Sequence, residues 1–259
     1  MQSQTASLAD VRSRWAQHDI DPRYEAISRD PRYGHYVRIP ERICRCLDYF
    51  KISSSRRAVR ERLHAYYLFI GVVDDVIDSS QPEAVREILR QLKNPKSFFE
   101  EEVKESDAQI VTEVFKRHIS VETYAIIVAK LEELHRVVIG ERSCGTIKTY
   151  IGQRKAIGAL TAEVSYLLIQ PLLKNEHRDL RRFLQKVGEV GCLVDSVIDL
   201  KADAKASLLK FNPTLRDYLK LISETLKDGL GILRTHTRLL GVFLEAITDN
   251  LLDFRFRPG

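Results

Sequence analysis

Apolar residues spaced three and four positions apart recur along almost the whole chain, and this periodicity limits the fold more than any other feature. Val85, Ile88, Leu89 and Leu92 follow that spacing, and the segment 121–138 follows it over several turns. Such spacing places apolar side chains on one face of an α-helix. The sequence contains no alternating strand pattern, no Asn-Gly hairpin signal and no repeat of fixed period. It therefore predicts an all-α protein of eight to ten helices.

Capping and turn residues divide the chain into the expected helices. Ser53–Ser55 supplies N-caps, and the pairs Asn94–Pro95 and Asn212–Pro213 act as stops. The expected helices run over residues 8–18, 40–50, from the Ser53–Ser55 caps to Asp78, and over 82–94, 107–119, 121–138, 146–173, 177–203, 214–232 and 233–252. The helix over 146–173 is expected to bend near Gly158.

Residues 1–40 read differently from the rest of the chain. Pro22, Pro31 and Pro40 are mixed with Gly34 and several tyrosines, so irregular structure is expected after the first short helix. The segment is predicted to act as an N-terminal arm or lid on a single domain that spans residues 1–259.

Composition supports a folded helical bundle around an apolar interior. Of the 259 residues, 44% are hydrophobic, which is enough to bury a sizeable core. No apolar run approaches the roughly 20 residues that span a bilayer, so we expect a soluble, cytoplasmic protein without stable membrane insertion. Four cysteines without paired spacing are expected to stay reduced. A net charge of +5 suits an anionic ligand, and no feature indicates nucleic-acid binding.

Carboxylates close one of the most apolar predicted helices. In the run from Tyr66 to Asp78, residues Tyr67, Gly71, Asp74 and Asp78 fall on one helical face. An aromatic ring, a glycine without a side chain and two carboxylates therefore lie on the same side of the helix. Acids in such an apolar setting suggest that this face meets something polar.

A second predicted helix ends in the same way. Asp195, Asp199 and Asp203 recur every four residues, and Gly188 and Cys192 precede them on the same face. Like charges at this spacing destabilise a helix, and carboxylates at its C-terminal end oppose the helix dipole. Divalent cations would reverse both penalties.

Magnesium with a diphosphate fits these carboxylates best. Mg²⁺ takes hard oxygen ligands, commonly one or two carboxylates with waters and substrate phosphates. The chain has no Cys/His spacing for zinc, no phosphate-binding Gly-rich loop and no defensible Ser–His–Asp arrangement. The alternative is that each acidic group is a solvated helix end.

With these two motifs the chain resembles the class I isoprenoid (terpenoid) synthase superfamily. Asp74-Asp75-Val76-Ile77-Asp78 matches the DDxxD motif, and the second acidic motif follows about 120 residues later. The resemblance implies a helical bundle around a central apolar cavity, in which Mg²⁺, three ions in all, binds the diphosphate of a prenyl substrate. It implies that Asp74 and Asp78 are metal ligands with Asp75 in support. Asp195, Asp199 and Asp203 would be the second set of ligands.

Two branches of this superfamily compete. Squalene and phytoene synthases share the i, i+4, i+8 acids, but they usually carry Arg where this chain has Gly71 and Gln where it has Cys192. The segment Tyr150–Lys155 is similar to the Tyr-Leu-x-x-Arg-Arg segment of bacterial terpene cyclases, and Arg154 precedes Asp195 by 41 positions. We favour a terpene cyclase, a carbon–oxygen lyase that ionises one farnesyl or geranylgeranyl diphosphate and cyclises the cation. A prenyltransferase that joins two prenyl diphosphates, and a non-catalytic helical protein with a degenerate site, are the alternatives.

The resemblance also assigns supporting residues. Arg154, Lys155 and Lys205 are expected to bind diphosphate, with the tail residues Arg255 and Arg257 as further candidates. The cavity is expected to be lined by Tyr67, Gly71, Gly158, Thr161, Gly188 and Cys192, with Phe69 and Tyr166 as additional aromatic liners. Each of the basic residues has a plain alternative as a surface charge, and each tyrosine as a core aromatic. A prenyl diphosphate is the expected partner, and a homodimer is left open.

Overall fold

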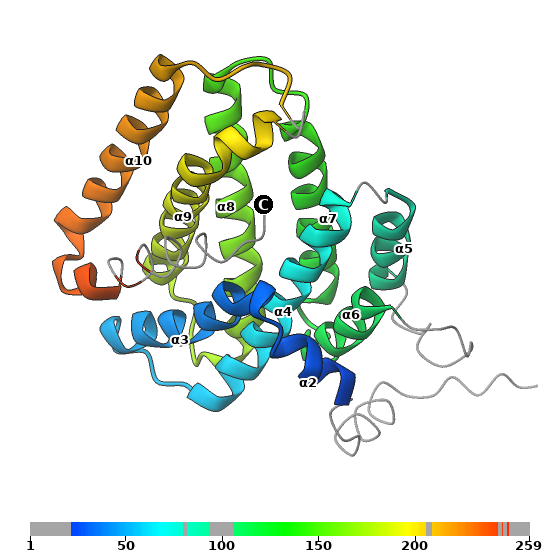
Figure 1. The fold of residues 1–259 in the computed structure, drawn as a ribbon. Coiled ribbons are helices and arrows are strands. Elements are labelled where there is room, and N and C mark those ends of the chain that lie inside the picture. The colour runs from blue at the N-terminus through cyan, green and yellow to red at the C-terminus, as the bar shows by residue number, and fades with distance from the viewer. Residues whose placement is uncertain are drawn as a thin grey trace, which may run out of the picture.

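The computed structural model describes residues 22–79, 82–93, 106–205 and 209–242, together with Glu245 and Thr248. Within these ranges the chain forms helices and no strand, which confirms the all-α class (Figure 1). The elements are α2 (Pro22–Ser28), η1 (Pro31–Tyr33), α3 (Gly34–Tyr49), α4 (Arg56–Asp78), α5 (Pro82–Lys93), α6 (Asp107–His118), α7 (Tyr124–Glu141), α8 (Ile147–Ile169), η2 (Gln170–Leu172), α9 (Arg178–Lys205), α10 (Leu215–Thr235) and η3 (Thr237–Leu239).

The predicted helices between the Ser53–Ser55 caps and Ile232 appear as α4 to α10, with ends displaced by a few residues. The predicted helix over 8–18 lies outside the described residues. The predicted last helix, 233–252, differs at its start, because α10 runs on to Thr235 and the turn η3 follows. Most of its remaining length also lies outside the described residues.

The expectation of irregular structure before residue 40 is wrong for the described part of that segment. α2 begins at Pro22 and η1 begins at Pro31, positions where the fixed φ of proline suits a helix start. α3 begins at Gly34 and continues through Pro40. α2 packs on α6, and α3 packs along α4, so residues 22–40 belong to the bundle.

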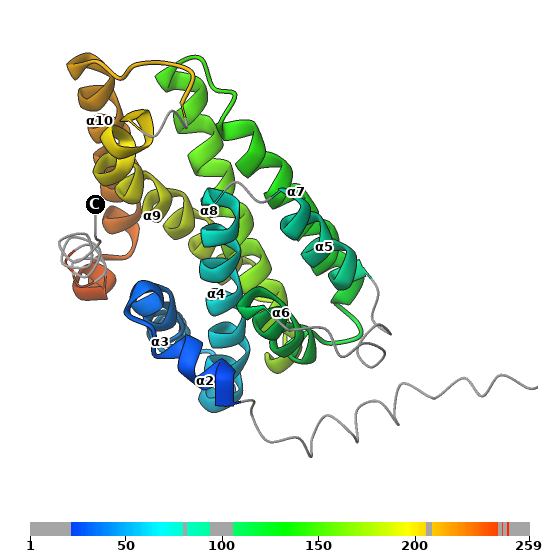
Figure 2. The same cartoon turned by 45° about the vertical axis from the view of Figure 1, so that its right-hand side comes forward.

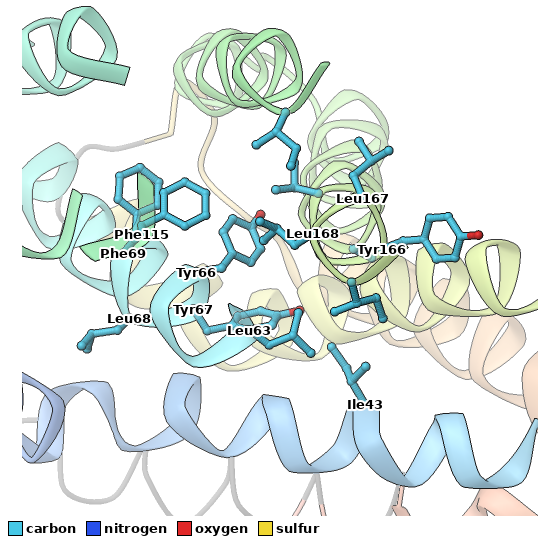
Figure 3. Close-up of a cluster of buried hydrophobic side chains, with 14 of the residues drawn as sticks. Ile43, Leu63, Tyr66, Tyr67, Leu68, Phe69, Phe115, Tyr166, Leu167 and Leu168 are labelled. Atoms are coloured by element: carbon cyan, nitrogen blue, oxygen red, sulfur yellow. The ribbon is translucent and has the colours of Figure 1, made fainter. Parts of the chain in front are cut away.

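Helix α4 lies in the middle of the bundle, between α3 and α6 (Figure 2). Ser55 caps its start by accepting a hydrogen bond from the Ala58 backbone N–H. Its apolar stretch is buried against aromatic neighbours, with the Phe69 ring stacked on Phe115 at a centroid distance of 4.7 Å (Figure 3). This packing fixes the direction in which the acidic end of α4 points.

Helices α8 and α9 form the most extensive helix pair of the fold, and two glycines lie at their crossing. A Cβ atom added to Gly158 would lie 2.1 Å from the carbonyl oxygen of Gly188, and one added to Gly188 would lie 2.2 Å from that of Gly158. The two backbones therefore touch where glycine is required. α8 is continuous through Gly158.

Helix α10 forms the outer edge of the bundle beyond α9 (Figures 1 and 2). It packs on α9 and, less extensively, on α8. Its buried residues include Leu221 and Ile232. No helix among the described residues has the length and apolar character needed to cross a membrane.

Candidate active site

An apolar cavity of about 330 Å³ lies among α3, α4, α5, α7, α8 and α9, and Leu239 and Val242 also line it. Its walls are mostly aliphatic, and Ile43, Ile70, Val73, Leu134, Ile157 and Val187 are representative. The aromatic liners include Tyr67 and Phe69 of α4. This composition is typical of a pocket that takes an apolar ligand.

Charged residues from four helices line the same cavity, and Arg42 of α3 is one of them. Asp74 comes from α4, Arg154 from α8 and Asp195 from α9. The two acidic motifs, far apart in the sequence, thus contribute carboxylates to one cavity. Asp78, Asp199 and Asp203 lie nearer the ends of the same two helices and are not among the lining residues. We refer to Asp74, Asp78, Asp195, Asp199 and Asp203 together as the acidic mouth.

The carboxylates of the acidic mouth influence one another. The pKa of Asp78 is raised to about 6 by loss of solvation and by the nearby Asp74. The pKa of Asp203 is also raised to about 6, by loss of solvation, by Asp199 and, more weakly, by Asp78 of the facing motif. The ends of α4 and α9 therefore lie within electrostatic range of each other. Negative charge is concentrated there, which favours a bound cation.

Asp75 is hydrogen-bonded to the N-terminal segment of the structure. Its carboxylate accepts hydrogen bonds from the Tyr33 hydroxyl at 2.8 Å and from Arg32 at 3.2 Å. It is not among the residues that line the cavity. Asp75 therefore holds the η1 segment against α4, and its predicted part in catalysis stays a prediction.

Two arginines lie at the acidic mouth, and Arg154 is the one that also lines the cavity. Its guanidinium donates two hydrogen bonds of 3.4 Å to the backbone carbonyl of Cys192 and contacts the Glu141 carboxylate at 3.5 Å. Both contacts hold the guanidinium at the cavity wall. The arrangement leaves a fixed positive charge beside the carboxylates of α9.

Sequence reasoning missed Glu141, the last residue of α7. Burial raises the pKa of this carboxyl group, and Arg154 opposes the shift. The next residue, Arg142, donates to the Ile77 carbonyl at 2.9 Å and lies 3.5 Å from the Asp78 carboxylate. An acid at the end of a third apolar helix is the same signal that drew attention to the other two.

The other predicted diphosphate-binding residues lie elsewhere. Lys155 points to α10, where its ammonium group lies 2.7 Å from Asp228 and 3.2 Å from Glu224. Lys205 is the exposed last residue of α9. Arg255 and Arg257 fall outside the described residues. Neither described lysine is among the cavity-lining residues.

Most of the predicted cavity residues do line the cavity. They are Tyr67, Gly158, Thr161, Gly188 and Cys192. The Tyr67 hydroxyl pairs with Ser165 at 2.9 Å, and burial raises the pKa of the Cys192 thiol to about 12, so this thiol stays protonated.

Gly71 and Tyr166 are placed differently from the prediction. A Cβ atom at Gly71 would lie 2.7 Å from the Tyr36 ring and 3.0 Å from the Tyr33 ring, so this gap is filled by aromatic side chains of the N-terminal segment. The Tyr166 hydroxyl accepts from the His177 backbone N–H, and Arg181 lies over its ring. Neither residue is among those that line the cavity.

The acidic mouth suits magnesium by the chemistry of its donors. All five side chains offer hard carboxylate oxygens, and two of them have raised pKa values that a divalent cation would relieve. Among the described residues, no three Asp, Glu, His or Cys side chains converge to form a preformed metal cage. Mg²⁺ usually binds through one or two carboxylates, completed by waters and substrate phosphates, so such a cage is not required for it.

No known protein family matches the chain, and no match was found among curated proteins or solved structures.

Proposed function

We propose that this protein is a class I terpene synthase that ionises one linear prenyl diphosphate with Mg²⁺ and cyclises the resulting cation. The observation that carries the proposal is that Asp74, Asp195 and Arg154 line one apolar cavity. A prenyl diphosphate has a matching division into a charged head and a long apolar chain. The site would bind the head at the acidic mouth and the chain in the cavity.

Magnesium bound by Asp74 and Asp78 on one side, and by Asp195, Asp199 and Asp203 on the other, would neutralise the charge that develops on the departing diphosphate. Arg154 would donate hydrogen bonds to the same group from its fixed position between Cys192 and Glu141. The aliphatic walls would exclude water from the allylic cation. Tyr67 and Phe69 would turn aromatic surface toward it.

The size of the cavity supports one substrate rather than two. Its volume of about 330 Å³ lies near the lower end of the range of about 300–1,000 Å³ for ligand pockets. This volume favours a cyclase over an enzyme that condenses two prenyl chains.

Product analysis tests the reaction. Purified protein is incubated with Mg²⁺ and geranyl, farnesyl or geranylgeranyl diphosphate, followed by mass spectrometry of the extract and an assay for released diphosphate. Cyclised product with an unchanged number of carbon atoms is expected. A doubled carbon skeleton would overturn the cyclase in favour of condensation. Absence of product and of diphosphate release with all three substrates would overturn the enzymatic proposal.

Substitutions test the metal ligands. Asp74→Ala and Asp199→Ala are each expected to abolish diphosphate release while circular dichroism shows unchanged helicity. The matched control is Asp48→Ala, which removes a carboxylate paired with Arg56 at the opposite end of α4. This control is expected to keep full activity. Activity retained by both Asp74→Ala and Asp199→Ala would refute the assignment of the ligands.

A further inference from the structure

The outer face of α10 carries a row of large apolar side chains that no other described element covers. Leu215, Leu219, Ile222, Leu226 and Leu230 are 76%, 59%, 38%, 59% and 53% exposed. Their spacings of four, three, four and four residues place them on one face of the helix. This face, which we call the outer stripe, is distinct from the buried face of Leu221 and Ile232. Single exposed leucines are ordinary, but a contiguous row marks an interaction site.

Basic residues run along one side of the outer stripe. Arg216, Lys220, Lys227 and Arg234 are the charged residues of α10 whose side chains are exposed. Three of them, Lys220, Lys227 and Arg234, repeat every seven positions, so they stay on one side of the stripe along its whole length. An apolar row with a basic border is the pattern of helices that lie in the interface of a membrane.

The acidic residues of α10 form ion pairs with lysines or cap the helix. Glu224 and Asp228 bind Lys155 of α8, and Glu224 also lies 3.8 Å from Lys227. Asp217 caps the helix by accepting from the backbone N–H and the hydroxyl of Thr214. Along α10, which the structure describes in full, these three acidic side chains are partly buried, whereas the basic ones are exposed.

This distribution of charge favours an anionic lipid surface over a second copy of the chain as the partner of the outer stripe. A second copy related by a two-fold axis would present the same face, and its basic border would find only partly buried carboxylates on α10 to pair with. An anionic lipid surface offers phosphates to the basic border and acyl chains to the leucines. It complements both parts of the face.

We propose that α10 docks the protein on an anionic membrane surface. The helix lies flat, with the outer stripe at the boundary between headgroups and acyl chains and with the basic border against lipid phosphates. This surface attachment is compatible with the absence of a membrane-crossing helix among the described residues. It does not depend on the reaction proposed above, because none of its residues lines the cavity.

Vesicle binding by the full chain tests this proposal. The protein is expected to co-sediment with phosphatidylcholine vesicles that contain phosphatidylserine, to bind those of phosphatidylcholine alone far more weakly, and to dissociate as salt is raised. The double variant Leu219→Ser/Leu226→Ser is expected to abolish binding. Lys220→Gln/Lys227→Gln is expected to weaken it roughly 30-fold, since each basic residue near such a surface contributes about a five-fold change in affinity.

Matched controls separate this face from general surface properties. Val121→Ser/Ile126→Ser removes two apolar side chains that are 50% and 51% exposed, one in the turn before α7 and one in its first turn. Lys148→Gln/Lys174→Gln removes two exposed lysines outside α10. Both controls are expected to bind vesicles as the unsubstituted protein does, with all variants checked for helicity by circular dichroism.

Two results would overturn the proposal. One is the absence of binding to phosphatidylserine vesicles by the folded, unsubstituted chain. The other is a dimer, seen by analytical ultracentrifugation, that Leu219→Ser/Leu226→Ser dissociates, in a protein that does not bind the vesicles. This result would assign the outer stripe to contact with a second copy of the chain. Neither result changes the expected diphosphate release, so failure here is distinguishable from failure of the proposed reaction.

Discussion

Two residues of α8 that are adjacent in the sequence, Arg154 and Lys155, have different structural roles. Arg154 faces the cavity, between the Cys192 carbonyl and Glu141. Lys155 faces α10, where it bridges Glu224 and Asp228. Adjacent residues on a helix point about 100° apart, which is why Arg154 and Lys155 contact different helices although they are neighbours in the sequence.

This separation predicts different outcomes for the two substitutions. Arg154→Gln is expected to weaken binding of inorganic diphosphate in the presence of Mg²⁺ by roughly 10- to 100-fold, the effect of losing hydrogen bonds to a charged group. Lys155→Gln is the matched control and is expected to leave diphosphate affinity within about two-fold while lowering the melting temperature. Isothermal titration calorimetry and thermal unfolding measure the two effects. Equal loss of affinity in both variants would contradict the separation.

Asp203 provides a prediction for pH. Its pKa of about 6 in the folded protein lies above the ordinary value of 3.8, so ionisation of this group opposes folding. The cost is present above about pH 6 and is gone below the ordinary carboxyl pKa. In the absence of metal, Asp203→Asn is expected to raise the melting temperature by roughly 3–5 °C at about pH 8, after allowance for solvent screening, and to have almost no effect at about pH 3.

The control for this prediction is a substitution that is expected to change the melting temperature in the opposite direction. Hydrogen bonds from Thr214 hold the pKa of Asp217 below its ordinary value, so its ionised form favours folding. Asp217→Asn is therefore expected to lower the melting temperature at about pH 8 and to lose this effect as the pH falls through the carboxyl range. A melting temperature of Asp203→Asn equal to that of the unsubstituted protein at both pH values would refute the raised pKa.

At the scale of elements, the sequence predicts what depends on local pattern and misses what depends on neighbours. The apolar spacing of Val85, Ile88 and Leu92 is local, and the corresponding helix α5 is present. The prolines Pro22 and Pro31 suggest irregular structure by composition, yet each stands at the first position of a helix, where proline favours the start. The tertiary contacts of a residue cannot be read from the residues next to it in the sequence. For this reason the sequence does not reveal the position of Glu141, and it wrongly suggests that Gly71 lines the cavity.

The crossing of α8 and α9 predicts a contrast between two glycines of one helix. Gly158→Ala would drive a Cβ atom to 2.1 Å from a backbone carbonyl oxygen, which no rotamer change can relieve. A loss of about 2–3 kcal/mol in the free energy of unfolding is expected from such overpacking. Gly152→Ala meets no atom within 4 Å and is expected to stabilise the same helix by up to about 1 kcal/mol. Urea denaturation compares the two, and equal stabilities would contradict the close crossing.

At the scale of the whole molecule, the cavity is the feature that joins elements distant in sequence. Gly191 lines it, and a side chain added there would meet no atom within 4 Å at its Cβ position. Gly191→Leu is therefore expected to fill part of the cavity without loss of stability, since leucine is also the better helix former by about 0.8 kcal/mol. Diphosphate release is expected to fall most for geranylgeranyl diphosphate and least for geranyl diphosphate.

The control for the cavity is a second glycine-to-leucine substitution, placed in a helix but away from the cavity. Gly152→Leu adds an equal side chain on the exposed side of α8. It is expected to leave the preference among the three chain lengths unchanged. A loss of activity in Gly191→Leu that is equal for all three chain lengths would show that the cavity does not hold the prenyl chain.

The contact between Gly158 and Gly188 also restricts how this bundle can be modified. Because carbonyl oxygens already lie against the opposite glycine, α8 and α9 cannot slide along each other or approach further. The pair forms a fixed frame, and only its partners across the cavity, α3, α4, α5 and α7, can be moved to reshape the interior. An engineer who wishes to accommodate a longer or bulkier guest in this protein would therefore vary those helices and leave the two glycines untouched.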